Sequence, residues 1–424
     1  MGMTAAEKIL ARAAGLREAH AGDIVYPVPD LVIIHDGVVM GAKQELDAIG
    51  IGRLFDPERV LMVTDHDVVY TSDRAAARGA FNRKAARAWG VKHFYDAGQG
   101  GHGHIFPTER GFVLPGTFYF DNDRHCTNAG GIGALALRVG TEITRVLATG
   151  TVWTMVPRTV KLTIRGELRS GVYARDLGFE IGKRLQPGGA FGVDIDYRVL
   201  EFAGALDQFN LAARVSLCST PTEMRAIGVF FPPSAAIVEA ARARAQRPFT
   251  PVYPDSDAQY EAAVEMDVSG LEPQVALPGG PHKAVDLAQV AGTRIDHAFI
   301  GSCGSGMYED LVAAGDILRG RRLAPGVRLI VTPGSEDTTR RMRREGLFDV
   351  FQDAGALVMP AGCGVCASGR TGLVHSGEIS ISSAVANGAG RFGAKDAKLY
   401  LGSPATVAAS AVSGRITDPR EFIP

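Results

Sequence analysis

The 424-residue chain has few cysteines and no long apolar run. Five cysteines in a chain of this length do not suggest a disulfide framework, which is typical of small secreted domains. No apolar stretch of about eighteen residues occurs, so no membrane span is expected. The N-terminus lacks the charged and then apolar pattern of a secretory signal. These absences predict a cytoplasmic protein with reduced thiols.

An excess of charge of one sign is also missing. Lysine and arginine number 45 against 46 aspartate and glutamate residues, and the formal net charge is −1. The richest cationic stretch, Arg340–Arg344, is followed by Glu345 and is predicted to form a solvated helix face. Charge this dilute cannot neutralise many phosphates, so nucleic-acid binding is not expected.

Glycine, by contrast, is abundant at 52 residues, and short apolar runs alternate with helical patterns. The runs Val60–Val63, Phe299–Ile300, Leu329–Val331 and Leu357–Met359 are each followed by turn-forming residues. Strands this apolar, separated by helices, are typical of parallel sheets that are buried on both faces. The sequence therefore predicts an α/β fold with mainly parallel sheets.

Helix signals are clear at both ends of the chain. Thr4 and Glu7 have the spacing of a capping box at the start of an N-terminal helix. Near the C-terminus, a predicted strand at Lys398–Leu401 precedes a helix with Ser403 as its N-cap and Pro404 at its first position.

The length allows two to four domains of ordinary size. The stretch Pro273–Lys283 is dense in proline and glycine and is predicted to be a linker. A weaker break is expected near Pro157, after a helical segment at Ile143–Trp153. We therefore expect three α/β/α domains, at residues 1–156, 157–275 and 276–424.

Three cysteines lie in glycine-rich turns directly after apolar strands. Cys303 follows one such run, and Cys363 and Cys366 form a Cys-x-x-Cys pair after another. The carboxyl ends of parallel strands are where open α/β sheets place their sites. Glycine lets the backbone approach a bulky inorganic group and leaves amides free to donate to sulfur. These thiols are candidate ligands of an iron–sulfur cluster.

Other interpretations of the three thiols stay open on spacing alone. A Cys-x-x-Cys pair could be a redox pair or half of a zinc site, but no second pair is present to complete a four-thiolate zinc site. All three could also be small buried residues without chemistry. Cys218 lies in an apolar run and is expected in the core, whereas the role of Cys126 is left open.

Many short motifs follow one another in a familiar order, and they are Gly22-Asp23-Ile24-Val25, His35-Asp36-Gly37, Asp65-His66, Gly140-Thr141-Glu142, Phe231-Pro232-Pro233, Ile300-Gly301-Ser302-Cys303, Cys363-Gly364-x-Cys366, Ser403-Pro404-Ala405 and Asp418-Pro419-Arg420. In this order the chain resembles the large subunit of isopropylmalate dehydratase and homoaconitase, in the aconitase superfamily, from about residue 4 to residue 422. The resemblance implies three domains around a central cluster site, without the swivelling fourth domain of single-chain members.

The resemblance also implies a cofactor and a reaction. The cofactor is a [4Fe–4S] cluster held by Cys303, Cys363 and Cys366. Three thiolates leave one iron without a protein ligand, and that iron can act as a Lewis acid. The implied reaction is a hydro-lyase reaction, in which water is lost from and added back to a carbon–carbon bond next to a carboxylate.

Histidine–carboxylate pairs are implied as the acid–base groups. The pairs are Asp65 with His66, His104 with Asp123, and His125 with Glu223. A carboxylate orients its imidazole and raises its basicity, which suits proton delivery to a leaving hydroxyl. The segment around His104 carries one extra residue relative to the family, so His102 is a rival for that role.

The sequence departs from the family at the expected substrate site. Arg124 stands where a substrate-contacting serine is usual, and Ser305 lies in Gly304-Ser305-Gly306-Met307, where the family has Thr-Asn-Gly-Arg. Only Arg391 remains of a motif that normally supplies further polar groups. An arginine binds a carboxylate through a two-pronged contact that smaller residues cannot supply. Arg124, Ser305 and Arg391 are therefore the predicted substrate contacts, with a hydroxy acid other than isopropylmalate as substrate; alternatively, Arg124 pairs with an acidic neighbour.

The chain ends just after the last motif, so we expect the swivelling domain as a separate small subunit in a heterodimer. The rival interpretation is a cluster-based iron or redox sensor, or a scaffold subunit, that keeps the fold without catalysis. A zinc-dependent hydrolase would need a compact set of nitrogen and oxygen ligands, and none is evident in the sequence.

Overall fold

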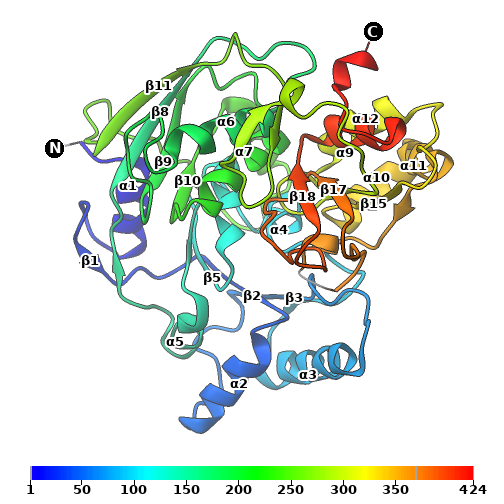
Figure 1. Cartoon of the computed structure of the whole chain (residues 1–424). Coiled ribbons are helices and arrows are strands. Elements are labelled where there is room, and N and C mark those ends of the chain that lie inside the picture. Colours follow the sequence, from blue (N-terminus) through cyan, green and yellow to red (C-terminus); the bar gives the residue numbers. More distant parts are fainter. Residues whose placement is uncertain (1, 368–369, 424) are drawn as a thin grey trace. The chain divides into compact units, whose positions relative to one another are not determined.

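A computed structural model describes residues 2–367 and 370–423 of the chain (Figure 1). The chain divides into two compact units, each assembled from separate stretches of sequence. The first consists of Met1–Thr163, Ile195–Asp207 and Arg225–Glu265, and the second of Ile164–Asp194, Gln208–Met224 and Met266–Pro424. The three-domain division by sequence range stays a prediction.

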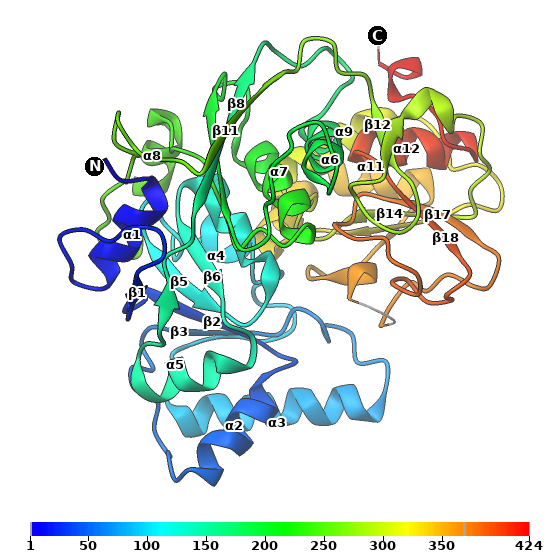
Figure 2. The ribbon, with the colours of Figure 1, turned by 60° about the vertical axis from the view of Figure 1, so that its left-hand side comes forward.

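The first unit is built on a parallel five-stranded sheet with the order β4-β3-β2-β5-β6. Its strands are β2 (Leu31–His35), β3 (Val60–Val63), β4 (His93–Tyr95), β5 (Phe118–Asp121) and β6 (Leu135–Arg138). The helices of this unit are α1 (Ala5–Ala13), α2 (Val39–Ala48), α3 (Asp73–Trp89), α4 (Phe106–Glu109), α5 (Ile143–Thr149) and α8 (Ala235–Arg242). Figure 2 shows α2, α3 and α5 on the same side of this sheet.

Two smaller sheets complete this part of the chain. A four-stranded sheet has the order β10-β9-β8-β11 and contains β8 (Thr159–Arg165), β9 (Val199–Gly204), β10 (Gly228–Phe230) and β11 (Ala262–Asp267). Strands β9 and β10 are parallel. A short antiparallel pair joins β1 (Ile24–Val25) to β7 (Thr154–Met155).

The second unit contains a seven-stranded sheet with the order β13-β12-β18-β17-β14-β15-β16. Its strands are β12 (Gln274–Ala276), β13 (Ala284–Asp286), β14 (His297–Gly301), β15 (Arg328–Thr332), β16 (Leu357–Val358), β17 (Ile379–Ser382) and β18 (Lys398–Leu401). All neighbours from β18 to β16 are parallel, whereas β12 pairs antiparallel with both β13 and β18. The helices are α6 (Ala174–Leu185), α7 (Leu211–Glu223), α9 (Tyr308–Leu318), α10 (Glu336–Arg344), α11 (Leu347–Ala354) and α12 (Pro404–Ser413).

Alternation along β14 separates two apolar clusters. Ala298 and Ile300 pack with residues of α9, α11 and α12, which lie on one side of the sheet (Figures 1 and 2). Phe299, one residue out of phase, packs in a different cluster, the one that contains Cys303 and Cys363. Successive side chains of a strand point to opposite faces. One face of the sheet therefore packs on α9, α11 and α12, and the other packs in the cluster that contains the cysteines.

The sequence-based prediction of an α/β fold with mainly parallel sheets is confirmed. The capping box of α1 is present, with the Thr4 amide donating to Glu7 at 2.8 Å and the Glu7 amide donating to Thr4 Oγ1 at 3.3 Å. The C-terminal strand is β18 as predicted, and the Thr406 amide donates to Ser403 Oγ at the start of α12.

Two local predictions are wrong. Residues Gln274–Ala276 of the expected linker form β12, and the proline and glycine that follow make the turn of a hairpin, which is closed by the Leu277 amide donating to the Lys283 carbonyl at 3.0 Å. Proline and glycine mark tight turns as readily as linkers, which explains the error. The expected helix Ile143–Trp153 ends at Thr149, because Gly150 takes a left-handed conformation with φ of 81°.

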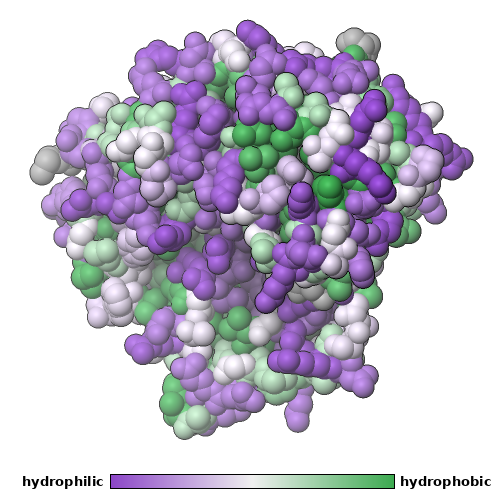
Figure 3. Space-filling view, viewed as in Figure 1, coloured by the Kyte–Doolittle hydropathy of each residue, from purple (hydrophilic) through white to green (hydrophobic). Residues whose placement is uncertain are grey.

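The molecular face in Figure 3 is mostly hydrophilic, and its apolar residues form small separate groups. Large apolar side chains that are more than half exposed include Ile24, Tyr26, Phe55 and Trp153. No helix among the described residues is both long and apolar enough to cross a membrane.

The close backbone packing at Gly130 predicts that Gly130→Ala lowers the stability of the fold. A Cβ at Gly130, in the 3₁₀ helix Arg124–Ile132, would lie 1.8 Å from the Val229 carbonyl oxygen. Val229 belongs to β10, whose backbone is held by its pairing with β9. We expect this change to lower the unfolding free energy by about 1–3 kcal/mol. The matched control is Gly41→Ala in α2, which meets no atom within 4 Å. It should raise stability by about 0.5–1 kcal/mol, because alanine loses less backbone entropy in a helix. Calorimetric unfolding of both variants checks this, and equal effects would contradict the packing argument.

Candidate functional site

The carboxyl ends of β2, β3 and β5 bring ionisable residues together in the first unit. His35 is the last residue of β2, and Asp121 is the last residue of β5. Asp65 and His66 follow the end of β3 by two and three residues. Because β2 lies between β3 and β5, His35 is placed between the two aspartates. This edge is where open parallel sheets carry their functional groups.

His35 bridges two buried carboxylates. Its Nδ1 lies 2.9 Å from Asp65 Oδ2, and its Nε2 lies 3.3 Å from Asp121 Oδ1. All three side chains are buried. Gly103 packs on the His35 ring so closely that a Cβ there would lie 2.6 Å from Cε1. The imidazole is therefore confined in one orientation between its two partners.

Asp65 is the centre of this network. Its Oδ1 lies 2.7 Å from His66 Nδ1, its Oδ2 accepts the Gly103 amide at 2.9 Å, and His102 Nδ1 lies 3.6 Å from Oδ2. His66 Nδ1 also lies 3.2 Å from Asp36 Oδ1. The predicted pair of Asp65 and His66 is thus close in the structure. The Asp65 carboxylate also lies close to the rings of His35 and His102, in addition to the expected His66.

The second group surrounds Asp121 and Asp123. His104 Nε2 lies 3.2 Å from Asp121 Oδ2 and 3.9 Å from Asp123 Oδ1, so its closer carboxylate is Asp121 and not the expected Asp123. His125 Nδ1 lies 3.2 Å from Asp123 Oδ1 within the same unit. Glu223 ends α7 in the second unit, and its pairing with His125 stays a prediction.

His102 and His104 are both buried, and a hydrogen bond joins them. The His104 backbone N–H donates to His102 Nδ1 at 3.2 Å. Both histidines are therefore candidates for the role expected of His104.

Buried charges shift the pKa values of these groups in opposite directions. Burial by itself would lower the pKa of His35, but Asp65 and Asp121 together raise it well above its ordinary value. Burial also opposes protonation of His66, yet Asp65 and Asp36 raise its pKa to about 10. Burial would raise the pKa of Asp65, but the charges of His35 and His66 hold it well below its usual range. The network therefore contains charged imidazoles at neutral pH.

Arg124 begins the 3₁₀ helix Arg124–Ile132 and is exposed. The preceding residue, Asp123, caps this helix by accepting the His125 amide at 2.9 Å. Cys126, on the same helix, is buried, and burial together with Asp121 raises the pKa of its thiol well above the usual value. Cys126 is therefore a protonated thiol.

In the second unit, the three candidate ligands lie at the carboxyl ends of parallel strands. Cys303 follows β14 by two residues, and Cys363 and Cys366 lie in the segment after β16. Strand β15 lies between β14 and β16, and its own loop ties the two cysteine loops together. Within it, the Gly334 amide donates to the Gly306 carbonyl at 2.7 Å, and the Pro333 carbonyl accepts the Gly362 amide at 3.3 Å.

Thr332, the last residue of β15, explains two of the glycines in these loops. A Cβ at Gly301 would lie 2.3 Å from the Thr332 carbonyl oxygen, and a Cβ at Gly364 would lie 2.4 Å from Thr332 Oγ1. Gly364 also has φ of 60°, and Ser302 has φ of 72°, a conformation that is costly for a residue with a side chain. Backbone strain is thus concentrated directly beside Cys303.

The three thiols share one buried apolar cluster. No disulfide joins any cysteine of the chain, all five of which lie in the described residues. Arg391 Nη2 donates to Cys366 Sγ at 3.4 Å, and the charge of that sulfur raises the pKa of Arg391. Ser305 is buried, and its hydroxyl donates to the adjacent Gly304 carbonyl at 2.7 Å. Three thiols, glycine backbones and a cationic donor fit the demands of an iron–sulfur cluster.

The remaining cysteine, Cys218, is buried in α7, which confirms its predicted place in the core.

Three residues of the histidine network were not among the predicted site residues: His35, Asp36 and Asp121. His35 and Asp121 had a usable signal, since each is a polar residue that ends an apolar strand. No compact nitrogen and oxygen ligand set was evident in the sequence, but the fold brings one together. His35, Asp65 and His66 offer ligand atoms that lie within 4.8 Å of one another.

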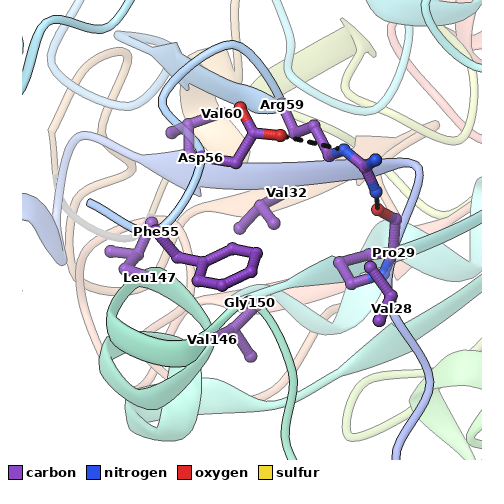
Figure 4. Close-up of a pocket in the computed structure, with 10 residues that line it drawn as sticks. All are labelled: Val28, Pro29, Val32, Phe55, Asp56, Arg59, Val60, Val146, Leu147 and Gly150. Carbon is purple, nitrogen blue, oxygen red and sulfur yellow. Dashed lines mark hydrogen bonds and ion pairs between the residues drawn. The ribbon is translucent and has the colours of Figure 1, made fainter.

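The pockets found in the first unit lie elsewhere. One is a cavity of about 20 Å³, about enough for one water, between β2, α5 and the segment that carries Phe55 (Figure 4). Arg59 spans its rim, 3.1 Å from Asp56 and 2.9 Å from the Pro29 carbonyl. A larger hollow of about 300 Å³ is lined by Glu7, His20, Ala21, Arg158, Thr159, Gln259, Tyr260 and Glu261. Neither contains a residue of the histidine network.

The raised pKa of His66 predicts a pH-dependent stability. A group whose pKa is higher when folded stabilises the fold fully below its unfolded pKa, near 6.5, and loses this contribution as pH rises through about 10. The stability advantage of the wild type over His66→Gln should therefore be largest below pH 6.5 and shrink toward pH 10. Urea unfolding at several pH values measures it, with His375→Gln, at an exposed histidine, as control. A constant difference across this range would show that His66 is not held charged.

Comparison with known proteins gives a consistent family relationship. The family model of the aconitase family (aconitate hydratase) matches residues 7–294 and 288–414. A 3-isopropylmalate dehydratase large subunit of Methanopyrus kandleri is 39% identical over all of both chains. A probable methanogen homoaconitase large subunit of Methanothermobacter thermautotrophicus is 37% identical, covering 99% of this chain and 98% of that protein.

A solved structure, that of Thermococcus kodakaraensis aconitase X in its holo-form, is similar in fold alone. It matches with a TM-score of 0.51 and 12% identity, covering 90% of this chain and 89% of that one. Because the family model spans most of the chain and full-length relatives share 37–39% of its residues, the chain belongs to the aconitase family.

Proposed function

We propose that this chain is the large subunit of a [4Fe–4S]-dependent hydro-lyase that acts on a small hydroxy carboxylic acid. The observation that carries the proposal is the convergence of Cys303, Cys363 and Cys366 in one buried cluster at the carboxyl ends of neighbouring parallel strands. Membership of the aconitase family, whose relatives are named dehydratase and homoaconitase large subunits, supports it.

Cys303, Cys363 and Cys366 would hold the cluster. When bound, it would supply a Lewis acid for the substrate hydroxyl and carboxylate. The cation of Arg391 beside Cys366 offsets the negative charge of the thiolate. The buried loops keep the thiols away from bulk water, which limits their oxidation.

The histidine network would supply and hold protons. His66 carries a proton at neutral pH, because its Nδ1 faces Asp65 and Asp36. About a quarter of its side chain is exposed, so Nε2 can reach a bound molecule. We assign to His66 Nε2 the protonation of the departing hydroxyl. His35, buried between Asp65 and Asp121, keeps these carboxylates ionised and oriented.

Two further histidines complete the proposed acid–base set. His125 with Asp123 and His104 with Asp121 are the other imidazole–carboxylate contacts of this edge. In each, the carboxylate orients the ring. We propose that these groups, with Glu223, position the substrate and relay protons.

The substrate is proposed to differ from isopropylmalate. Arg124 is exposed at the start of its 3₁₀ helix, and we assign it to a substrate carboxylate. Arg391, which contacts Cys366, is the second assigned carboxylate contact, with Ser305 beside Cys303. Candidate substrates are 2- or 3-hydroxy diacids of the isopropylmalate, homoaconitate, citramalate, maleate or dimethylmalate type.

A separate small subunit is part of the proposal. The relatives are named large subunits, which supports a second polypeptide that completes the site. We propose that the two subunits form a heterodimer in the cytoplasm. The reducing conditions of the cytoplasm would keep the three thiols reduced. The chain alone should then have little or no activity.

The rival function is a cluster-based sensor or a scaffold without catalysis. The histidine network argues against it, because burying this many charged groups costs stability that a scaffold has no reason to lose. A zinc hydrolase at His35, Asp65 and His66 gains a compact ligand set from the structure, but it would leave the three cysteines without a role.

Iron and acid-labile sulfide tell these possibilities apart. Protein purified without oxygen should contain about four of each per chain, and Cys363→Ser should lose most of both. Cys218→Ser is the matched control, because it removes another buried cysteine outside the three-thiol cluster. It should retain its iron. An iron-free wild type after anaerobic reconstitution would exclude the hydro-lyase proposal.

The role of Arg124 can be tested on the candidate acids with the small partner added. Loss of a charge-assisted contact in Arg124→Ala should raise the KM by on the order of tenfold or more, and Arg124→Lys should recover part of it. Arg145→Ala, at an exposed arginine that pairs with Glu142, controls for loss of surface charge. If the KM of Arg124→Ala equals that of the wild type, Arg124 does not bind the substrate.

A further inference from the structure

Arg175 is a fully buried arginine that the sequence pattern did not single out. It is the second residue of α6, and only 1% of it is exposed. A buried guanidinium is costly unless its charge and its N–H groups are compensated. The contacts of Arg175 therefore indicate which groups compensate its charge and its N–H donors.

The contacts that Arg175 makes use only part of its donor set. Nη2 donates to the Ala384 carbonyl at 2.5 Å, and the guanidinium lies over the Phe179 ring, 4.6 Å from its centre. Nε and Nη1 are buried and have no hydrogen-bond partner among residues 2–367 and 370–423. Arginine presents its donors in a rigid planar fork, so these unused groups point in a defined direction.

The neighbours of Arg175 belong to the cysteine site. Phe179 and Ala384 are members of the same buried cluster as Cys303, Cys363 and Cys366. Burial lowers the pKa of Arg175 to about 10, and the charges that oppose this fall are those of Cys303, Cys366 and Glu223. Arg175 thus lies in the field of the sulfur atoms, on a different element from Arg391.

We propose that Arg175 is a positioning residue, whose Nε–H and Nη1–H groups donate to sulfur of the cluster held by Cys303, Cys363 and Cys366. The inference rests on the proposed function, since it assumes that these cysteines bind a cluster. Hydrogen bonds to sulfur are a principal means by which proteins stabilise such clusters and set their potentials.

A purely structural role would leave a different pattern. Arg214 in α7 is equally buried, and its Nε donates to the Phe209 carbonyl at 3.0 Å. Arg175 keeps Nε and Nη1 for a group outside the polypeptide that the structure describes. Removing Arg214 should therefore harm the fold, whereas removing Arg175 should harm the cluster.

The experiment compares Arg175→Met, Arg175→Lys and Arg214→Met in the full chain, reconstituted without oxygen. We expect Arg175→Met to release iron to a chelator on the order of 10- to 100-fold faster than the wild type, with Arg175→Lys in between. Its cluster should be harder to reduce, because a donor to sulfur is lost, and an EPR-monitored titration reads this potential. The thermal midpoint of metal-free Arg175→Met should equal or exceed that of the wild type, because an uncompensated buried cation is gone. That of Arg214→Met should fall.

Each outcome decides a separate point. Iron release and potential equal to the wild type in Arg175→Met would overturn the inference while leaving the proposed function intact. A metal-free Arg175→Met that unfolds as early as Arg214→Met, with an unchanged potential, would overturn it in favour of a structural role. A wild type that takes up no iron would overturn the proposed function itself.

Discussion

Buried charge has to be compensated by nearby partners, and this constraint organises both candidate sites. Asp65 and Asp121 are fully buried carboxylates that would be costly without partners. His35 lies between them and contacts both, so that one cation serves two anions. At the edges of the network, the cationic His66 lies 2.7 Å from Asp65, and His104 lies 3.2 Å from Asp121.

Parallel strands deliver these groups to one place. In the first unit, adjacent strands end in His35 and Asp121, and a third leads to Asp65. In the second unit, β14 leads to Cys303 and β16 to the other two cysteines, with β15 between them. The loops can approach each other only where a side chain is absent, as at Gly301 and Gly364 against Thr332. These two glycines are thus a consequence of how closely the loops pack.

Much of the architecture could be predicted from local sequence. Apolar runs with turn residues after them predicted strands, and the capping patterns of Thr4 and Ser403 predicted helix starts, because these signals act within a few residues. The hairpin after Gln274 was mistaken for a linker, because composition alone does not say whether the chain folds back on itself. The aconitase relationship was found from many motifs in order, which no single motif would have carried.

Some residues of the candidate sites could not be predicted from the sequence. Their roles depend on contacts with residues that are far away in the chain. Asp121 stands 86 positions from His35 and Arg175 stands 209 positions from Ala384, so no periodicity links them. Nothing in Ala174-Arg175-Asp176 separates a buried arginine from a surface one, since position near a helix start fits either. Burial becomes visible only when α6 packs on the cysteine side of the sheet.

The two sites have one arrangement in common. In each, a cationic side chain is fixed through one nitrogen, which is Nδ1 in the partly exposed His66 and Nη2 in the buried Arg175. His66 uses Nδ1 on Asp65 and Asp36, which leaves Nε2 for the proton transfer that we propose. Arg175 uses Nη2 on a backbone carbonyl and keeps two nitrogens. A protein selected for stability alone would satisfy every buried donor internally, so unused donors beside buried charge mark the places where the fold is shaped to hold something else.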